Sequence, residues 1–386
     1  MQDSREKALK KALPIILLIG LFILCGLPAT GQGSLSVQLY RAAREGRVAE
    51  IQPLLKKGAN IEARFADGEI WPYVTDEIKR TPLIAAAVNG KIDVLQLLLK
   101  NGANVEATDD NNNTALIAAA IAGQTEAVRQ LLKNGANVNA VGAMGETALD
   151  AAAEVGKTDV AQVLLDNSAD MEATGNIANG TALILAAKND HADIVYLLLY
   201  RGAKIEPGGS SGYETALTRA ASNGDAEVVR LLLGKGANIE ARNSNGQTAL
   251  MEAAASGKTA AARLLLDKGA NIDARSNDGR TALLWAAIGH HTAVARLLLD
   301  KGANIEAASN DGDTALIAAA CSEADKTGAE KQGLVQLLLN KGANIDAQNK
   351  AGLTPMTCPN RMKPPAVAEL LEQASREKKT AAGKPQ

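Results

Sequence analysis

Aromatic residues are scarce in this 386-residue chain, which has two Trp, five Tyr and two Phe, or 2% of the sequence. A large single core could hardly tolerate so few, whereas a stack of small units built from Leu and Ala can. An excess of one charge is also lacking, because 41 Lys and Arg residues stand against 43 Asp and Glu residues and leave a net charge of −2. We therefore expect no strongly basic surface, and neither nucleic acid nor an acidic membrane as a partner.

Histidine, the usual residue of catalytic and metal sites, occurs only three times. His191 stands apart from His290 and His291, and these two adjacent residues do not project together from a helix. The segment 208–212 is similar to a phosphate-binding loop in composition only, since no Lys-Ser/Thr follows it and no strand precedes it. The sequence therefore predicts no enzyme, no metal site and no cofactor.

What the chain does contain is a motif of the form Lys-Gly-Ala-Asn-Ile-Glu/Asp-Ala, repeated along almost its whole length. Six of the eight intervals between copies are 33 or 34 residues, and the other two are 44 and 40. Such a period is typical of a stack of small units rather than of one globular core. The Gly slot of the motif falls at positions 58, 102, 135, 168, 202, 236, 269, 302 and 342.

The unit at residues 80–107 indicates what each repeat folds into. Its two apolar runs have helical spacing, so the unit is predicted to be a helical hairpin. Thr81 is predicted to cap the first helix, with Pro82 in the first helical position, where its missing N–H costs nothing. Gly102 is predicted to end the second helix in the left-handed conformation. The predicted core positions are Leu83, Ala86 and Ala87 on the first helix and Ile92, Leu95, Leu98 and Leu99 on the second.

The order Thr-Pro-Leu, Ala-Ala, Gly, Leu-Leu-Leu and Gly-Ala-Asn-Ile resembles the ankyrin repeat, over about residues 36–375 and about ten units. The resemblance implies an all-α solenoid of helix-turn-helix units with finger-like β-turns, which binds protein partners along a concave groove. Proline follows Thr only at Pro82 and Pro355, and the His that follows Leu in the family is missing, which is expected to weaken internal polar bonding but not the fold. The Thr positions are Thr81, Thr114, Thr147, Thr181, Thr215, Thr248, Thr281, Thr314 and Thr354.

Residues 1–31 lie outside the repeats. Four basic residues between positions 5 and 11 precede the apolar run Ala12–Leu27, and small residues at 28–31 suit cleavage after Gly31. We interpret 1–31 as a secretory signal, which places the repeats in a bacterial periplasm or outside the cell. The apolar run is shorter than the roughly 20 residues that span a bilayer. An uncleaved inner-membrane anchor, with the repeats outside the cytoplasm, is the alternative.

Two cysteines lie within the repeats, Cys321 and Cys358. They are seven and four residues after their Thr positions, which places them one helical turn apart on adjacent inner helices. In an oxidising compartment they can form a disulfide, but the offset and the nearby insertion also fit two separate thiols. Both alternatives stay open, and separate thiols are the favoured interpretation.

Most repeats carry Ala or Leu four residues after Thr, but three consecutive repeats carry Arg219, Glu252 and Trp285. Stacked at one offset, these would form a row across the middle of the groove, and Trp and Arg are enriched at binding hot spots. The structural alternative is that Trp285 fills space while Arg219 and Glu252 form a solvent-screened pair of little energetic value. The residues just before Thr in the same repeats extend the candidate protein-binding surface: Glu214, Gln247 and Arg280.

Two insertions interrupt the period. The first, at 64–79, contains Phe65, Trp71 and Tyr73; it either folds over the degenerate first unit, which is favoured, or presents an aromatic patch to a partner. The second, at 321–333, is predicted to be a solvated loop. Residues 376–386 are predicted to be a disordered tail.

We therefore expect one ankyrin-repeat domain over residues 32–375 that acts as a monomeric, non-catalytic protein-binding module. Its partner is an unidentified protein, and it contacts a membrane only through Ala12–Leu27 if that run is retained. A membrane-tethered scaffold and a secreted effector or inhibitor that binds a foreign protein are the alternatives. An enzyme with its site in the insertions would need His or converging carboxylates there, and 64–79 has no His.

Overall fold

The computed structural model describes residues 34–66, 78–173, 180–206, 214–321, 328–358 and 365–382. Within these ranges all regular secondary structure is helical, apart from two isolated β-bridges. The all-α repeat fold predicted from the sequence is thus confirmed. By its contacts the chain divides into two compact units, Met1–Asn137 and Val138–Gln386, which are described separately. The predicted secretory signal lies outside the described residues.

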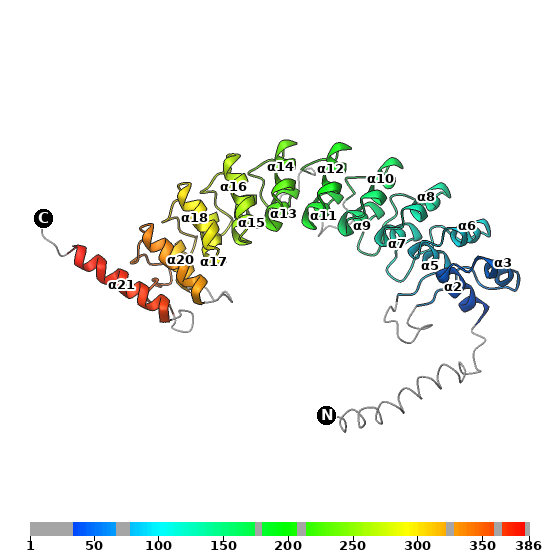
Figure 1. The fold of residues 1–386 in the computed structure, drawn as a ribbon, viewed down its shortest axis with the longest axis horizontal. Coiled ribbons are helices and arrows are strands. Elements are labelled where there is room, and N and C mark those ends of the chain that lie inside the picture. The colour runs from blue at the N-terminus through cyan, green and yellow to red at the C-terminus, as the bar shows by residue number, and fades with distance from the viewer. Residues whose placement is uncertain are drawn as a thin grey trace, which may run out of the picture. The chain divides into compact units, whose positions relative to one another are not determined.

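The first unit contains three helical hairpins packed side by side (Figure 1). Within this unit the first helix of one hairpin contacts the first helix of the next, and a second helix returns beside each. The helices are α2 (Leu35–Glu45) with α3 (Val48–Lys56), α5 (Pro82–Val88) with α6 (Ile92–Lys100), and α7 (Ala115–Ala122) with α8 (Thr125–Lys133).

The second unit continues the same pattern and ends in a longer helix (Figure 1). Its first helices form one row and its second helices another. The helices are α9 (Ala148–Val155) with α10 (Thr158–Asp166), α11 (Ala182–Lys188) with α12 (Ala192–Tyr200), α13 (Ala216–Asn223) with α14 (Ala226–Gly234), α15 (Ala249–Ala255) with α16 (Thr259–Asp267), α17 (Ala282–Ile288) with α18 (Thr292–Asp300), α19 (Ala315–Cys321) with α20 (Gly328–Asn340), and α21 (Pro365–Ala382).

The repeated threonine precedes the first helix of each described hairpin except the first, where Ser34 caps α2. Thr81 is the N-cap of α5, its hydroxyl accepts a hydrogen bond from the Ile84 N–H at 3.3 Å, and Pro82 occupies the first turn, as predicted. Because the caps lie between neighbouring repeats, they are almost fully buried. The threonines that precede these first helices are all exposed by 9% or less: Thr81, Thr114, Thr147, Thr181, Thr215, Thr248, Thr281 and Thr314.

The core follows the predicted helical faces, with one adjustment. Leu83, Ala86 and Ala87 of α5 are buried as predicted. On α6 the buried residues are Val94, Leu95 and Leu98, while the predicted Ile92 and Leu99 are only half-buried. The buried face of α6 is therefore rotated toward Val94, because α6 packs both on α5 and on the second helices of the neighbouring repeats.

An acidic side chain of the repeated motif joins most repeats to the next, and the Asn139 amide oxygen takes its place once, accepting from the Asp170 N–H at 2.9 Å. In the first unit the Glu62 carboxylate accepts a hydrogen bond from the backbone N–H of Asn104 at 2.7 Å, and Glu106 accepts one from Asn137 at 2.8 Å. The same bond recurs in the second unit. Its members there are Glu172 with the N–H of Lys204, Glu240 with Asn271, Asp273 with Asn304 and Glu306 with Asn344.

Different side chains complete this series at the two ends. At the start, the Ser36 hydroxyl of α2 accepts from the Asn60 N–H at 2.9 Å, in place of an acid from a preceding repeat. At the end, Asp346 has no following motif, and its carboxylate pairs with the Lys378 ammonium of α21 at 2.6 Å. Both end repeats therefore have substitutes for the missing neighbour.

The C-terminal region differs from the predictions in three respects. The tenth repeat has no first helix between Thr354 and Cys358, where Thr354 instead closes a short turn with Thr357. Helix α21 runs to Ala382, so residues 376–382 of the predicted disordered tail are helical, held in part by Lys378. Residues 328–333 of the predicted solvated loop form the start of α20, in which Lys331 is buried.

Candidate functional site

The three unusual residues of the sequence lie on three adjacent first helices. Arg219 is on α13, Glu252 on α15 and Trp285 on α17, and α15 packs against both other helices. All three side chains are half-buried. The equivalent residues of other described repeats are smaller and more buried: Ala85, Ala118, Ala151 and Leu185 are 6% exposed or less, and Ala318 is half-buried. We call Arg219, Glu252 and Trp285, together with Glu214, Gln247 and Arg280, the central row.

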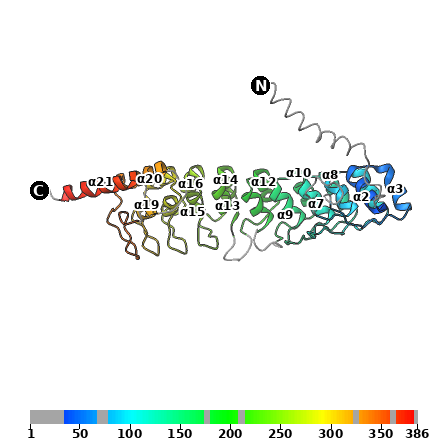
Figure 2. The same ribbon diagram turned by 90° about the horizontal axis from the view of Figure 1, so that it is seen from below.

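The loops that precede these helices hold part of the row in place. Figure 2 shows the loops of this unit projecting from the helices on one side. Main-chain hydrogen bonds join neighbouring loops, from the N–H of Asn277 to the Asn245 carbonyl at 3.0 Å and from the N–H of Asn310 to the Asp278 carbonyl at 2.9 Å. The loop residues of the row are thus positioned by contacts between repeats.

Arg219 forms its ion pair with Glu214, the residue before the capping threonine of the same repeat. The guanidinium Nη2 lies 3.5 Å from the Glu214 carboxylate. The sequence alternative of a pair between Arg219 and Glu252 is therefore replaced by a pair within one repeat. Arg219 Nε is buried and has no hydrogen-bond acceptor among the described residues.

Glu252 lies at the centre of the row and is held by neutral hydrogen-bond donors. The Asn243 side-chain amide donates to its carboxylate at 2.9 Å, and the Ser222 hydroxyl also donates to it. Burial raises the pKa of Glu252, and the Glu214 carboxylate raises it further, while Arg219 and the two hydrogen bonds lower it. In the part of the chain that the structure describes, no cation lies within ion-pair distance of Glu252.

Trp285 is covered on one side by Arg280, which precedes the capping threonine of the same repeat. The guanidinium carbon lies 5.0 Å from the centre of the Trp285 ring, a cation–π contact. Arg280 also pairs with Asp278 at 2.9 Å. The Trp285 Nε1–H is buried without an acceptor among the described residues.

Gln247 differs from the other members because it is directed into its own loop. It is 7% exposed, and its side-chain oxygen accepts hydrogen bonds from Asn243 at 3.3 Å and Asn245 at 3.4 Å. Gln247 therefore supports the loop and offers little surface to a partner. Asn243, which also binds Glu252, has no signal in the sequence beyond the usual polar composition of these loops.

The aromatic residues of the first insertion are described only in part. Phe65 pairs through its backbone with Arg80, and its ring contacts the fully buried Tyr40 of α2, with ring centres 5.8 Å apart. Phe65, at the start of the insertion, thus packs on the first repeat. Trp71 and Tyr73 lie outside the described residues.

A second group of aromatic residues, not predicted from the sequence, lies on α12. Tyr196 and Tyr200 stack on the exposed face of α12 with ring centres 6.2 Å apart, and they are 57% and 71% exposed. Tyr196 also lines a surface pocket of about 630 Å³ with Arg230 and Lys235 of the next repeat. Two Tyr four residues apart, in a chain so poor in aromatics, are the signal that points to this pair.

The histidines contribute contacts between repeats. His191 Nε2 lies 3.1 Å from the Glu154 carbonyl oxygen, and His291 Nε2 lies 2.9 Å from that of Ala255. Both carbonyls belong to the preceding repeat. Among the described residues, no cluster of three or more His, Cys, Asp or Glu side chains is arranged to hold a metal ion.

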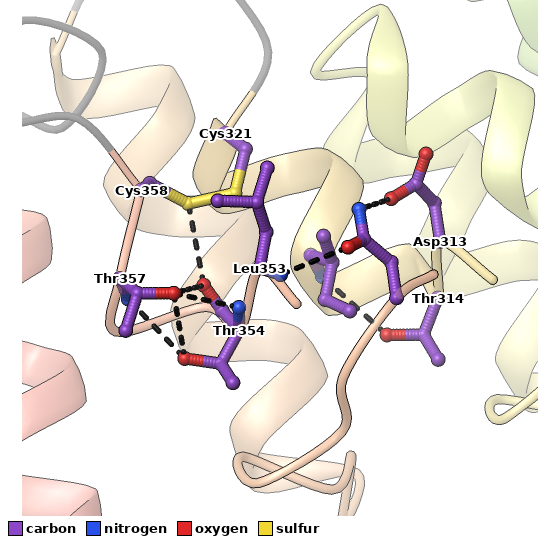
Figure 3. The surroundings of a disulfide bond; sticks show 9 residues. Asp313, Thr314, Cys321, Leu353, Thr354, Thr357 and Cys358 are labelled. Atoms are coloured by element: carbon purple, nitrogen blue, oxygen red, sulfur yellow. Dashed lines mark hydrogen bonds between the residues drawn. A yellow bond between two sulfur atoms is a disulfide. The ribbon is translucent and has the colours of Figure 1, made fainter. Parts of the chain in front are cut away.

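The structure joins Cys321 and Cys358 in a disulfide (Figure 3). Cys321 ends α19, Cys358 follows the turn closed by Thr354 and Thr357, and the two Cα atoms are 5.3 Å apart. The interpretation favoured from the sequence, two separate thiols, therefore differs from the structure, which has the alternative, a disulfide. The bond ties the incomplete tenth repeat to the ninth.

None of the described helices has the length and apolarity needed to cross a membrane.

Repeated pairs of short helices that contact their neighbours define a helical-repeat protein. The family described as ankyrin repeats (3 copies) matches residues 39–142, 83–175, 141–208, 183–276 and 271–349. These overlapping matches cover most of the sequence, so the chain belongs to the ankyrin-repeat family. Ankyrin repeats are protein–protein interaction modules and are generally non-catalytic scaffolds. A comparison with curated proteins gave no match.

Proposed function

We propose that this chain is a non-catalytic module that captures a protein partner through the central row. The observation that carries the proposal is the change at one position of the repeat, from Ala or Leu in most repeats to Arg219, Glu252 and Trp285 in three consecutive ones. Trp and Arg are the residue types that most often carry binding energy, and here both are half-buried on the helices that flank α15. The folded-in Gln247 is not part of the contact surface.

The proposal is tested by affinity capture with the full chain as bait. Arg219→Ala combined with Trp285→Ala is expected to lose the partner while helical content by circular dichroism stays unchanged. The control is Arg296→Ala, which removes a guanidinium from an exposed position on a second helix. Recovery of the same proteins by the double variant and the unchanged chain would rule out the central row as the binding surface.

We further propose that the repeats act outside the cytoplasm, in a periplasm or beyond the cell. The basic residues followed by the apolar run Ala12–Leu27 support export. The disulfide between Cys321 and Cys358 also supports it, because disulfides persist mainly in oxidising compartments. N-terminal sequencing of the protein from the expressing cell decides between the alternatives. A start near Gln32 means cleavage, whereas an intact start in the membrane fraction means a tethered scaffold.

A secreted effector or inhibitor that binds a foreign protein is the remaining version of this function. It differs from a resident periplasmic protein only in where the chain and its partner are found. Fractionation of culture medium and periplasm, followed by capture from each fraction, distinguishes the two. We expect the chain to be a monomer in either case, which light scattering after gel filtration measures.

A further inference from the structure

The charges of the central row are unevenly matched. The Arg219 guanidinium is paired with Glu214, and the Arg280 guanidinium is paired with Asp278 and covers Trp285. Both cations of the row thus already have an acidic partner. Of the charged side chains in the central row, only that of Glu252 has no ion-pair partner among the described residues.

Other cations of the neighbouring loops are also engaged elsewhere. Arg242, in the loop before α15, donates to the carbonyl oxygens of Gly246 at 2.8 Å and Arg275 at 2.6 Å. Arg275, in the loop before α17, donates to the Ala308 carbonyl. These guanidiniums bind main-chain oxygens along the loops, so they do not neutralise Glu252.

The surroundings of Glu252 favour a cation supplied from outside. Asn243 and Ser222 hold the carboxylate from within the protein. On the next first helix, Trp285 occupies the equivalent position and offers an aromatic ring, to which cations are attracted. In the loop before the preceding first helix, α13, Glu214 adds a second carboxylate. An acidic group would meet two carboxylates here and two guanidiniums that are already paired.

Resting on the proposed function of the central row, we propose that the partner presents a basic segment. A Lys or Arg side chain of that segment pairs with the Glu252 carboxylate beside the Trp285 ring. The unpaired, half-buried carboxylate is the observation that selects a basic occupant over an acidic or an apolar one. In the complex, removal of water from this pair strengthens it relative to the exposed ion pairs elsewhere on the repeats.

Synthetic peptides test the charge preference on the full chain. The Trp71→Phe variant leaves Trp285 as the single tryptophan, so its fluorescence reports on this position alone. The probes are blocked Gly-Ser peptides of one length that carry Lys, Arg, norleucine or Glu at the same positions. Lys and Arg peptides are expected to change the Trp285 emission in a saturable and salt-sensitive way, whereas norleucine and Glu peptides are not.

A matched pair of variants assigns the effect to Glu252. Glu252→Gln keeps the shape of the side chain and is expected to weaken binding of the Lys and Arg peptides about tenfold. Glu227→Gln, which removes an exposed carboxylate from a second helix, is expected to leave binding unchanged. Circular dichroism checks that both variants fold. Equal binding of Lys and norleucine peptides, preference for Glu peptides, or no change on Glu252→Gln would overturn the proposal.

The affinity capture described above separates this inference from the function on which it rests. If the partner is lost with the Arg219 and Trp285 substitutions but retained at full affinity with Glu252→Gln, the central row binds the partner and the cation proposal fails. If the partner is retained with all of these substitutions, both proposals fail. Loss of the partner with Glu252→Gln, together with the peptide preference, supports both.

Discussion

The Glu240 carboxylate accepts a hydrogen bond of 2.7 Å from the backbone N–H of Asn271, a residue of the next repeat. Asn271 in turn accepts a bond from the Asp273 N–H through its side-chain oxygen at 3.1 Å, and the Asp273 carboxylate accepts from the Asn304 N–H at 3.0 Å. The Asn and the acid of the repeated motif therefore have one shared role. The Asn side chain closes the turn of its own repeat, and the acidic side chain accepts a hydrogen bond from the turn of the following repeat.

Loss of one such bond is expected to weaken the interface between two repeats. Glu240→Ala removes a charged acceptor and leaves the Asn271 N–H to water, at a cost of about 1 kcal/mol in the free energy of unfolding. Glu240→Gln retains an acceptor and is expected to cost less. Urea denaturation followed by circular dichroism measures both changes. Glu227→Ala, on an exposed face of α14, is the control, and an equal effect of the two alanine substitutions would contradict the proposed role.

Ser168 is expected to be a weak point of the repeats. It occupies the glycine slot of the motif with a φ of 64°, in the left-handed region where a side chain is unfavourable. Ser168→Gly should therefore stabilise the protein by about 1 kcal/mol, less the extra flexibility that Gly gives the unfolded chain. Gly102 occupies the equivalent slot with a φ of 85°, and a Cβ added there meets no atom within 4 Å. Gly102→Ala, which adds a side chain in the left-handed region, should therefore destabilise the protein. Opposite shifts in the urea midpoint are the expected result, and shifts of the same sign would refute the explanation.

The parts of the fold that depend on local chemistry were predictable from the sequence. A threonine hydroxyl can cap a helix that starts at the following apolar run, and a glycine can end a helix in the left-handed conformation. Thr81 and Gly102 could therefore be placed from the local sequence alone. The period of 33 or 34 residues then predicted that the hairpins stack on one another. The acid of the motif repeats just as regularly, but its partner is 31 residues or more away, and no local rule identifies it.

The candidate site was predictable only as a set of positions. Equal offsets in consecutive repeats correctly placed Arg219, Glu252 and Trp285 on adjacent helices. Which charge pairs with which depends on rotamers and on loop geometry, so the pairing of Arg219 with Glu214 and the inward turn of Gln247 required the structure. The length of α21 was also missed, because the helix is fastened by side-chain contacts with the preceding repeat.

The disulfide is expected to hold the incomplete tenth repeat in place. Cys321 and Cys358 should resist alkylation until a reductant is added, which mass spectrometry of the alkylated peptides detects. The loop closed by the bond spans 37 residues, for which the chain-entropy argument gives a stabilisation of about 4 kcal/mol. Cys321→Ser with Cys358→Ser should therefore increase hydrogen exchange in α21 and leave the first repeats unaffected. Alkylation of both cysteines without reductant, in protein taken from the expressing cell, would refute the pairing.

Asp150 should make the second unit less stable at neutral pH than at mildly acidic pH. Its carboxylate forms a capping box with Thr147, accepting from the backbone N–H at 3.0 Å and from the hydroxyl at 2.8 Å. Desolvation by burial nevertheless dominates and raises the pKa of Asp150 from 3.8 to about 6. The folded state thus holds this proton more tightly than the unfolded state does. Its contribution to stability is complete below the unfolded pKa and is lost as the pH rises through the folded one.

Asp150→Asn removes this titration while keeping an oxygen that can accept from Thr147. The stability of the unchanged chain relative to this variant is therefore expected to fall between about pH 4 and about pH 7. The full amplitude corresponds to about 3 kcal/mol, since each unit of pKa difference equals about 1.4 kcal/mol. Urea denaturation across this pH range measures it, with Asp159→Asn as the control for loss of one exposed negative charge. If the difference between Asp150→Asn and the unchanged chain is constant with pH, the carboxyl is solvated in the folded protein and the burial argument is wrong.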